Sequence, residues 1–287
     1  VRLVRGSHIV VDKLYDHDKS FICQNDDGRI FFLIPYEDKF TLIGTTDIDH
    51  GRSASEVEIS EEEKQYICDS ANTYLNSEIK RSDIVWSYSG VRPLYDDGAS
   101  KAQEATRDYV IKAEEHDSSL MINIFGGKIT TYRRLSEAIL KHIETFLGQR
   151  GDPWTDNSSL PGGDVDVDGL FDLNNKIQEK YPFLNEEIVK RLVRSYGTVS
   201  FDIFASAKNI ESLGESFGSG LYEKEVVYLV QNEWARTSED ILFRRSKLGL
   251  SLTKNEKQKL DQFLEKYQKL SKTSESSVKQ DNIVETV

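Results

Sequence analysis

The stretch of residues 120–132, LMINIFGGKITTY, constrains the fold of this chain more than any other. Its apolar first half predicts a buried strand, Gly126 and Gly127 end that strand, and apolar residues then recur at the spacing of a helix. A strand that passes into a helix through two glycines leaves bare backbone for a ligand to approach. It also directs the N–H groups and the positive dipole end of the helix toward that ligand. We therefore predict a site for a negatively charged or electron-rich group here, with Lys128 at its mouth.

The same turn has two other interpretations. A nucleotide triphosphatase loop requires Gly-x-x-x-x-Gly-Lys-Ser/Thr. Ile122 occupies its first glycine position and Ile129 follows the lysine, so that interpretation fails. The second alternative is a structural turn in which the glycines only relieve steric crowding. The turn by itself leaves a ligand site and a structural turn equally open.

The composition limits the classes of function. With 287 residues, of which 38% are apolar and 30% charged, the chain is long enough for about two globular domains. Its net charge of -12 argues against a nucleic-acid partner, because a phosphate backbone would be repelled. The two cysteines, Cys23 and Cys68, lack metal or redox spacing and indicate a reducing compartment. No stretch approaches the roughly 20 apolar residues of a membrane span, although a peripheral membrane contact remains allowed.

The first half of the chain predicts an antiparallel sheet. Short apolar runs flank an Asp-Gly pair at residues 25–28, which favours a tight hairpin, and a third strand follows over 39–44. Ser60 and Glu63 form a capping box that begins a helix. Further strands are predicted over residues 84–94, 107–112 and 120–125, the last two paired as a hairpin.

A change of composition marks a domain boundary. Between residues 148 and 169 prolines and glycines replace periodic structure, and we divide the chain into domains 1–150 and 151–270. The second domain predicts helices only, one over residues 185–196 and a last one, capped by Thr253, that reaches about residue 270. The polar stretch 271–287 is predicted to be a disordered tail. The expected fold class is therefore α+β, a sheet portion followed by an all-α domain.

Three basic side chains are candidates for binding an anion. Pro93 keeps Arg92 extended at the end of a strand, and Arg107 leaves another strand near a turn. With Lys128, these two guanidinium groups could clamp a phosphate or carboxylate by charge-assisted hydrogen bonds. The alternative is that Arg107 pairs with Asp108 or another surface acid, and spacing alone favours that alternative.

The histidines predict no metal site, because no two of the five have the helical spacing of metal ligands. His8 is nevertheless a candidate functional residue, since Gly6 and Ser7 expose the chain beside it. A structural role for His8 is the simpler interpretation when the residue is taken alone.

Six motifs occur along the chain in a fixed order. They are Gly-Ser-His-Ile-Val-Val at 6–11, Ile-Gly-Thr-Thr-Asp at 43–47, Ser-Gly-Val-Arg-Pro-Leu at 89–94, Thr-Arg-Asp-Tyr at 106–109, Gly-Gly-Lys-Ile-Thr-Thr-Tyr-Arg at 126–133 and Leu-Pro-Gly-Gly-Asp at 160–164. Together they closely resemble the motifs of the bacterial FAD-dependent, respiratory glycerol-3-phosphate dehydrogenases. The resemblance implies a flavoprotein of the D-amino-acid-oxidase type, with antiparallel sheets facing substrate and FAD and an all-α C-terminal domain.

The chain departs from that family in one respect. The family's FAD lies on a Gly-x-Gly-x-x-Gly βαβ unit, and this sequence contains no such fingerprint. The chain begins at Val1 and has a single methionine, Met121, so we expect a piece of a longer protein. It should correspond to the C-terminal part of the enzyme, and alone it should neither retain FAD nor turn over substrate.

The resemblance also implies a reaction and a location. The reaction is oxidation of sn-glycerol 3-phosphate to dihydroxyacetone phosphate, with a hydride passing to FAD and electrons then passing to a membrane quinone. The protein would be cytoplasmic and peripheral on the cytoplasmic face of the inner membrane, with a homodimer as a candidate assembly. The basic run at Arg244, Arg245 and Lys247 is a candidate contact with an anionic membrane surface, although an ordinary exposed helix end is the simpler interpretation.

The resemblance assigns roles to residues of this sequence. Contacts to FAD are expected from Gly126, Gly127, Lys128, Ile129, Thr130 and Thr131. Contacts to the substrate are expected from Arg92, Arg107, Thr46 and Asp47. Either His8 or Lys128 would take the hydroxyl proton, and the sequence does not choose between them.

Two alternatives to this function remain. One is a glycerol-3-phosphate oxidase, a related flavoprotein that passes electrons to oxygen. The other is a non-catalytic phosphate-binding or interaction fragment, because the residues that would hold half of the cofactor are absent from this sequence.

Overall fold

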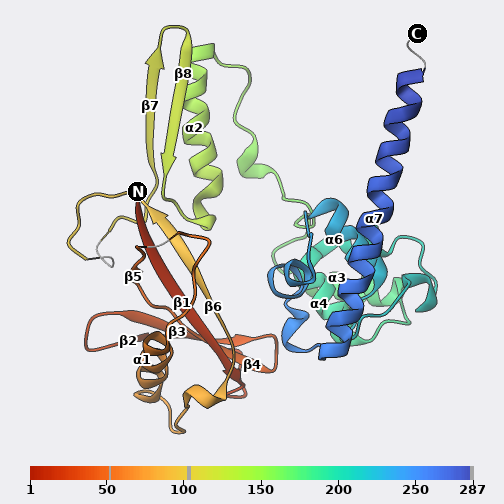
Figure 1. The fold of residues 1–287 in the computed structure, drawn as a ribbon, viewed down its shortest axis with the longest axis horizontal. Helices are drawn as coiled ribbons and strands as arrows, with labels where there is room; N and C mark the ends of the chain where they lie inside the picture. The colour runs from red at the N-terminus through yellow and green to blue at the C-terminus, as the bar shows by residue number, and fades with distance from the viewer. Residues whose placement is uncertain (52, 102–104, 285–287) are drawn as a thin grey trace. The chain divides into compact units, whose positions relative to one another are not determined.

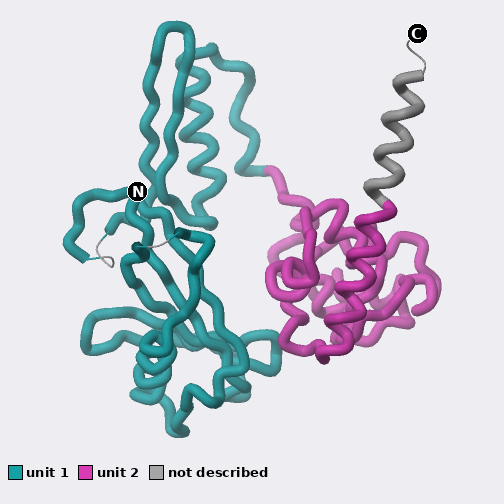
Figure 2. Tube along the Cα trace, viewed as in Figure 1, with its two compact units in different colours: residues 1–157 teal, residues 158–287 magenta. Residues whose placement is uncertain are grey.

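The computed structural model describes residues 1–51, 53–101 and 105–284, with side chains described as far as residue 270. The chain divides into two compact units, residues 1–157 and 158–287 (Figure 2). The division lies within the proline- and glycine-rich stretch between residues 148 and 169. Each unit is described by itself below.

Unit 1 contains an antiparallel sheet built around its first strand (Figure 1). The strands are β1 (Arg2–Asp12), β2 (Phe21–Gln24), β3 (Ile30–Tyr36), β4 (Phe40–Gly44), β5 (Ile48–Asp49) and β6 (Ile84–Leu94). Their order is β2-β3-β4-β1-β5, and β6 pairs with β1. The predicted antiparallel sheet is confirmed, and Gly28, with φ of +81°, makes the turn of its first hairpin.

Helix α1 (Glu61–Asn72) covers part of this sheet. The Ser60 side chain accepts the N–H of Glu63 and the Glu63 side chain accepts the N–H of Ser60, so the predicted capping box is present. The helix buries Ile67, Cys68 and Ala71 in a cluster that also contains residues of β1, β3 and β4. A short 3₁₀ turn, η1 (Arg81–Asp83), then leads into β6.

The rest of unit 1 is the hairpin-helix element predicted from residues 107–147. Strands β7 (Val110–His116) and β8 (Ser119–Phe125) pair in register from Val110 opposite Phe125. The 3₁₀ turn η2 (Ile129–Thr131) follows the two glycines, and α2 (Tyr132–Leu147) follows the turn. None of the α2 side chains, all within the described residues, is fully buried, so its apolar face is only partly covered. A last 3₁₀ turn is η3 (Thr155–Asn157).

The described part of unit 2 is helical, as predicted, apart from one isolated antiparallel bridge between Ser216 and Tyr222. Its elements are α3 (Leu170–Lys180), α4 (Glu186–Tyr196), η4 (Gly197–Val199), α5 (Ser200–Phe204), η5 (Glu211–Leu213), α6 (Glu223–Asn232), the π-helical turn η6 (Asp240–Arg245), η7 (Leu248–Leu250) and α7 (Lys254–Val284). Asn185 caps the start of α4 by accepting the N–H of Ile188. The bounds of helix α7 continue past the predicted end near residue 270, into residues whose side chains are not described. The predicted disordered tail, 271–287, falls outside the residues whose side chains are described and stays a prediction.

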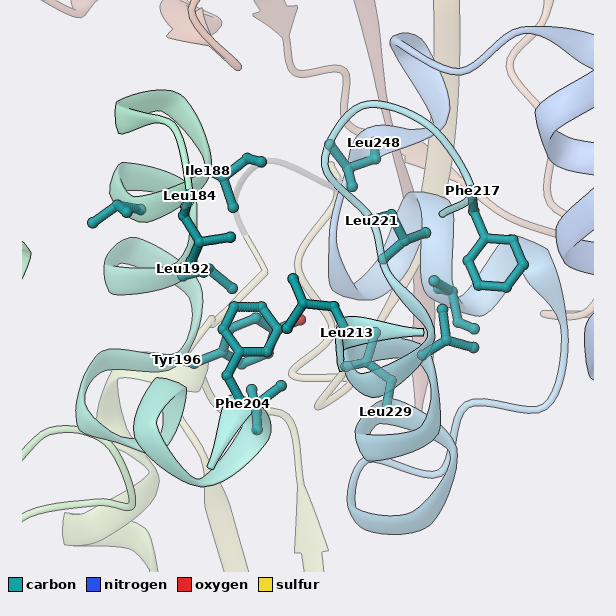
Figure 3. Close-up of a cluster of buried hydrophobic side chains, with 14 of the residues drawn as sticks. Leu184, Ile188, Leu192, Tyr196, Phe204, Leu213, Phe217, Leu221, Leu229 and Leu248 are labelled. Carbon is teal, nitrogen blue, oxygen red and sulfur yellow. The ribbon is translucent and has the colours of Figure 1, made fainter. Parts of the chain in front are cut away.

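The core of unit 2 joins helices and connecting turns from its whole length. Figure 3 shows side chains of α4, α5 and α6 meeting those of the loop around Phe217 and Leu221. Arg191 of α4 lies within this unit and is held by Glu225 of α6, at 2.6 Å and 2.7 Å for the two bonds between them. Tyr196 donates to the same carboxylate at 2.7 Å. A buried charged network therefore ties α4 to α6.

Candidate active site

The candidate site begins on the face of the sheet shared by β1 and β6. In their register His8 lies opposite Tyr88, Gly6 opposite Gly90 and Val4 opposite Arg92. Directly paired residues of antiparallel strands, and those two positions away, lie on one face. His8 and Arg92 therefore share a face, and the two glycines leave a strip without side chains between them.

Arg92 lies across that strip. A Cβ built on Gly6 would be 2.3 Å from the Arg92 Nη1 atom, so only glycine leaves room for the guanidinium in this position. Nη1 donates to Asp47 Oδ1 at 3.0 Å and Nη2 donates to Thr45 Oγ1 at 3.3 Å. Burial lowers the pKa of Arg92 while Asp47 opposes that shift, and an arginine so far above neutrality stays charged.

Asp47 joins the two candidate arginines. Its Oδ2 accepts a hydrogen bond from Arg107 Nη2 at 2.9 Å, while its Oδ1 accepts from Arg92. The two guanidinium groups, predicted from distant parts of the sequence, are therefore brought together by one carboxylate. Arg107 does pair with an acid, as in the simpler interpretation, but that acid is Asp47. Asp108 instead accepts from Lys128 at 2.8 Å.

A pocket of about 580 Å³ lies beside the arginines. It is lined by Val91, Arg92, Pro93, Leu94, Arg107, Gly126, Gly127, Lys128, Tyr132 and Leu135. The strand-end arginines and the glycine turn after β8 thus meet in one cavity. The structure brings together five of the predicted site residues here.

The glycine turn has the bare backbone that a ligand requires. Gly126 and Gly127 have φ of +68° and +104°, values that other residues rarely adopt. A Cβ on Gly126 would also come within 3.1 Å of the Asp108 carbonyl oxygen. No side chain caps the start of α2 at Thr131. The α-helix begins later than predicted, because the 3₁₀ turn at 129–131 intervenes.

The remaining predicted cofactor residues lie in that 3₁₀ turn. Thr131 donates both its N–H and its hydroxyl to the Lys128 carbonyl, each at 3.0 Å, so Thr131 tightens the turn. The Ile129 side chain is 90% exposed. Thr130 is likewise exposed. Their side chains are accessible to a ligand, and the predicted contacts to FAD stay a prediction.

His8 is held as a neutral imidazole beside the arginine. Its ring stacks on Tyr88 with centroids 5.0 Å apart and planes 8° from parallel, and a Cβ on Gly44 would lie 2.6 Å from its Cδ2. The His8 Nδ1 atom is buried without a partner. Burial first, and then the charge of Arg92, lower the pKa of His8 to about 4. At neutral pH the His8 ring is therefore unprotonated, although the low pKa also makes it a weak base.

We expect the titration of His8 to show this shift directly. In an NMR titration of the chain, the His8 ring signal, assigned by its loss in His8→Asn, should change near pH 4 instead of near pH 6.5. Because the pKa is lower in the folded state, the unfolded chain binds this proton first as the pH falls. Stability should thus be lost between about pH 6.5 and pH 4. A midpoint at or above 6.5 would contradict burial of a neutral ring.

Thr46 corrects a predicted substrate contact. Its side chain is 1% exposed, and its hydroxyl donates to Glu63 Oε1 at 2.7 Å and accepts the Ser7 N–H at 3.0 Å. The hydroxyl is fully used inside unit 1 and does not line the pocket. Of the predicted pair, only Asp47 reaches the arginines.

The basic run near residue 245 makes local contacts within unit 2. Arg244 pairs with Glu239 at 2.9 Å and with Asp240 at 3.0 Å, and Arg245 donates to the Glu233 carbonyl at 2.8 Å. Leu248 is buried in the core of unit 2. Paired arginines and a buried leucine fit the ordinary helix end, which was the simpler interpretation, and the membrane contact stays a prediction.

Within the described residues no helix is both long and apolar enough to cross a membrane. Within the same residues no cluster of three or more His, Cys, Asp or Glu side chains could hold a metal ion.

Sequence reasoning missed how uncharged residues shape the site. Gly6 makes room for Arg92, Gly44 makes room for His8, and Tyr88 stacks on the imidazole. Glycines inside strands are a signal of close approach and could have been used. Glu63 was assigned only to the helix cap, and its link to Thr46 has no local signal in the sequence.

Comparison with known families places this fold. The model described as FAD dependent oxidoreductase matches residues 1–133, and the model described as C-terminal domain of alpha-glycerophosphate oxidase matches residues 153–277. The first match covers the sheet and the glycine turn of unit 1, and the second match covers most of unit 2. Part by part, the chain is therefore similar to FAD-dependent oxidoreductases of this two-domain type, and the predicted fold class is confirmed.

The relatives of this chain show which FAD-dependent oxidoreductases it resembles. The chain is 40% identical over 277 residues to the aerobic glycerol-3-phosphate dehydrogenase of Escherichia coli, covering 96% of this chain and 55% of that protein. It is 41% identical over 257 residues to the D-erythritol 1-phosphate dehydrogenase of Brucella abortus, covering 90% of this chain and 51% of that protein. The resemblance to FAD-dependent glycerol-3-phosphate dehydrogenases is thus confirmed. The chain spans about half the length of these relatives.

A solved structure shows the same fold. The glycerol-3-phosphate dehydrogenase from Bacillus halodurans, complexed with FAD, superposes with a TM-score of 0.67 over 92% of this chain and 56% of that one, at 24% identity.

The residues present here fit one part of FAD, the flavin ring. Gly126 and Gly127 leave backbone without side chains, the start of α2 has no side-chain cap, and Lys128 adds a positive charge. This donor set suits the electron-rich edge of a flavin ring, which becomes more negative on reduction. A glycine-rich turn for the pyrophosphate is absent from the sequence, so these residues account for only part of the cofactor.

Proposed function

We propose that the protein containing this chain oxidises sn-glycerol 3-phosphate to dihydroxyacetone phosphate. One observation supports it above all: Arg92 and Arg107, joined by Asp47, line the same pocket as the Gly126–Gly127 turn. A phosphate site and a flavin-ring site in one cavity are what a flavin-dependent phosphopolyol dehydrogenase requires.

The arginine pair binds the phosphate. Two guanidinium groups and the Asp47 carboxylate leave one net positive charge, and Asp47 uses only one N–H of each arginine. Each guanidinium has five donors, so several remain for phosphate oxygens. The Asp47 carboxylate fixes both guanidinium groups before the substrate binds, so less conformational entropy is lost on binding.

The substrate's hydroxyl proton passes to His8 in this proposal. His8 is neutral and can accept it, whereas the Lys128 ammonium is in an ion pair with Asp108 and has no free lone pair. Since Nδ1 is the buried nitrogen, Nε2 is the candidate acceptor. FAD, when bound, supplies the acceptor for the hydride. Lys128 and the start of α2 stabilise negative charge that develops beside them.

Electron transfer from the flavin to a membrane quinone belongs to the same proposal, as does a peripheral position on the cytoplasmic face of the inner membrane. The aerobic relatives and the six motifs support it. A homodimer remains part of the proposal.

Two alternatives differ in acceptor and in substrate. The match to the alpha-glycerophosphate oxidase domain favours oxygen as an alternative acceptor. The D-erythritol 1-phosphate dehydrogenase relative favours a longer polyol phosphate as an alternative substrate.

The test is anaerobic reduction of the flavin in the longer protein that contains this chain. Adding sn-glycerol 3-phosphate should remove the oxidised-flavin absorbance, glycerol without phosphate should not, and a quinone analogue should restore it. Faster reduction by D-erythritol 1-phosphate, or peroxide formed in air at the rate of turnover, would replace the proposed substrate or acceptor. The chain alone should show neither stoichiometric flavin absorbance nor turnover, and a yellow chain would show that it holds the whole cofactor.

A further inference from the structure

The loop of residues 45–47 separates β4 from β5, two strands that both pair with β1. Strand β4 pairs with β1 from His8 to Asp12, and β5 pairs with Val4 and Arg5. Between them, opposite Ser7, the Thr46 hydroxyl accepts the Ser7 N–H at 3.0 Å. A side chain therefore takes the place of a strand carbonyl, and the position of the loop depends on what holds Thr46.

Glu63 holds Thr46. The Glu63 side chain is 2% exposed, and its Oε1 accepts from the Thr46 hydroxyl at 2.7 Å and from the Ser7 hydroxyl at 2.8 Å. Its Oε2 accepts the Ser60 N–H at 2.9 Å and pairs with Arg5 at 2.7 Å. A capping box needs only the bond to Ser60. The other three partners, from β1 and from the loop, are more than a helix cap requires.

The residues on each side of Thr46 hold the arginines. Thr45 and Asp47 both accept hydrogen bonds from Arg92, and Asp47 also accepts from Arg107. Since Thr46 is fixed by a buried carboxylate, the two flanking acceptors are fixed relative to β1. The spacing of the two guanidinium groups is thereby set from α1.

We propose that Glu63 is a positioning residue, which acts through Thr46 to hold Arg92 and Arg107 at the spacing that binds the substrate's phosphate. The proposal rests on the proposed function for the identity of the ligand. The link from Glu63 to the arginines does not depend on the proposed function, because its hydrogen bonds are present in the chain itself.

Two variants and a control test the link in the longer protein with its flavin. Thr46→Val removes the hydroxyl at nearly constant volume, and Glu63→Gln removes the charge. Ser60→Ala destabilises the same helix start without touching the loop. Both test variants should raise KM for sn-glycerol 3-phosphate about tenfold or more, since small displacements of binding groups have such effects. Flavin content should be unchanged, kcat should change much less, and Ser60→Ala should keep the wild-type KM.

A second readout does not depend on activity. Phenylglyoxal modification, mapped by mass spectrometry on the chain itself, should be faster at Arg92 and Arg107 in Thr46→Val than in wild type. The rate at Arg134, an exposed arginine of α2, should not change. If wild type fails to oxidise any phosphopolyol but this acceleration is seen, the proposed function fails and the positioning role stands. If modification and KM in both variants equal those of wild type, the positioning role is wrong.

Discussion

Glu225→Ala is expected to destabilise unit 2 by about 3–5 kcal/mol, because it leaves the Arg191 guanidinium buried without its carboxylate. The Glu225 side chain has no exposed surface, and it accepts two bonds from Arg191 and one from Tyr196. Burial, and then the neighbouring Glu225 carboxylate, raise the pKa of Tyr196, so the phenol remains a donor. A loss of this size is a large part of the stability of an ordinary domain.

Urea unfolding of the chain, combined with hydrogen exchange of α4, should measure this loss. Glu179→Ala on the exposed face of α3 is the control and should stay within about 0.5 kcal/mol of wild type. Arg191→Met combined with Glu225→Met should lose less than Glu225→Ala alone, because no unpaired charge remains. If Glu225→Ala behaves like Glu179→Ala, the network does not stabilise the unit.

Arg92→Lys should lower kcat/KM for sn-glycerol 3-phosphate about 10- to 100-fold in the longer protein. A planar fork with several donors is replaced by a point charge that cannot reach Asp47, Thr45 and a phosphate together. The loss of one charge-assisted bond is worth about 1.5–3 kcal/mol, which corresponds to that range. Flavin content should remain at the wild-type level, because the flavin contacts are expected at the glycine turn.

Steady-state kinetics and the flavin spectrum together test this expectation. Arg134→Lys is the matched control, since that side chain is exposed on α2 and lies 4.0 Å from its nearest acid. Its kinetics should equal those of wild type. If Arg92→Lys also leaves kcat/KM unchanged, Arg92 only supports the 45–47 loop and the phosphate binds elsewhere.

Local patterns were sufficient for most of the secondary structure. The Ser60–Glu63 capping box, the Asp-Gly turn before β3 and the stop at Gly197 each depend on residues within about one turn of each other. The glycine turn after β8 was predicted for the same reason, since an apolar run, glycine and helical spacing are local, but β8 is not buried as predicted. The start of α2 was displaced by a 3₁₀ turn because ends of helices are set by weak, competing hydrogen bonds.

The site could be predicted as a set of residue types but not as a set of partners. Arg92 and Arg107 were recognised as an anion clamp, yet Asp47, which joins them, lies 45 and 60 residues away along the chain. The same limit explains why the burial of Thr46 was not foreseen. Whether a hydroxyl turns inward depends on which distant strand or helix packs over it, and a single sequence does not specify this.

The sequence by itself determined the order of elements, the helical character of the second unit, the resemblance to a family and the residue types of the candidate phosphate and flavin sites. Only the tertiary structure decided that Asp47 bridges the arginines, that Glu63 holds Thr46 and that His8 is buried neutral against Tyr88. The physical reason is range: backbone propensity and capping act over a few residues, whereas burial, pKa shifts and ion pairs depend on groups that only the packed fold brings together.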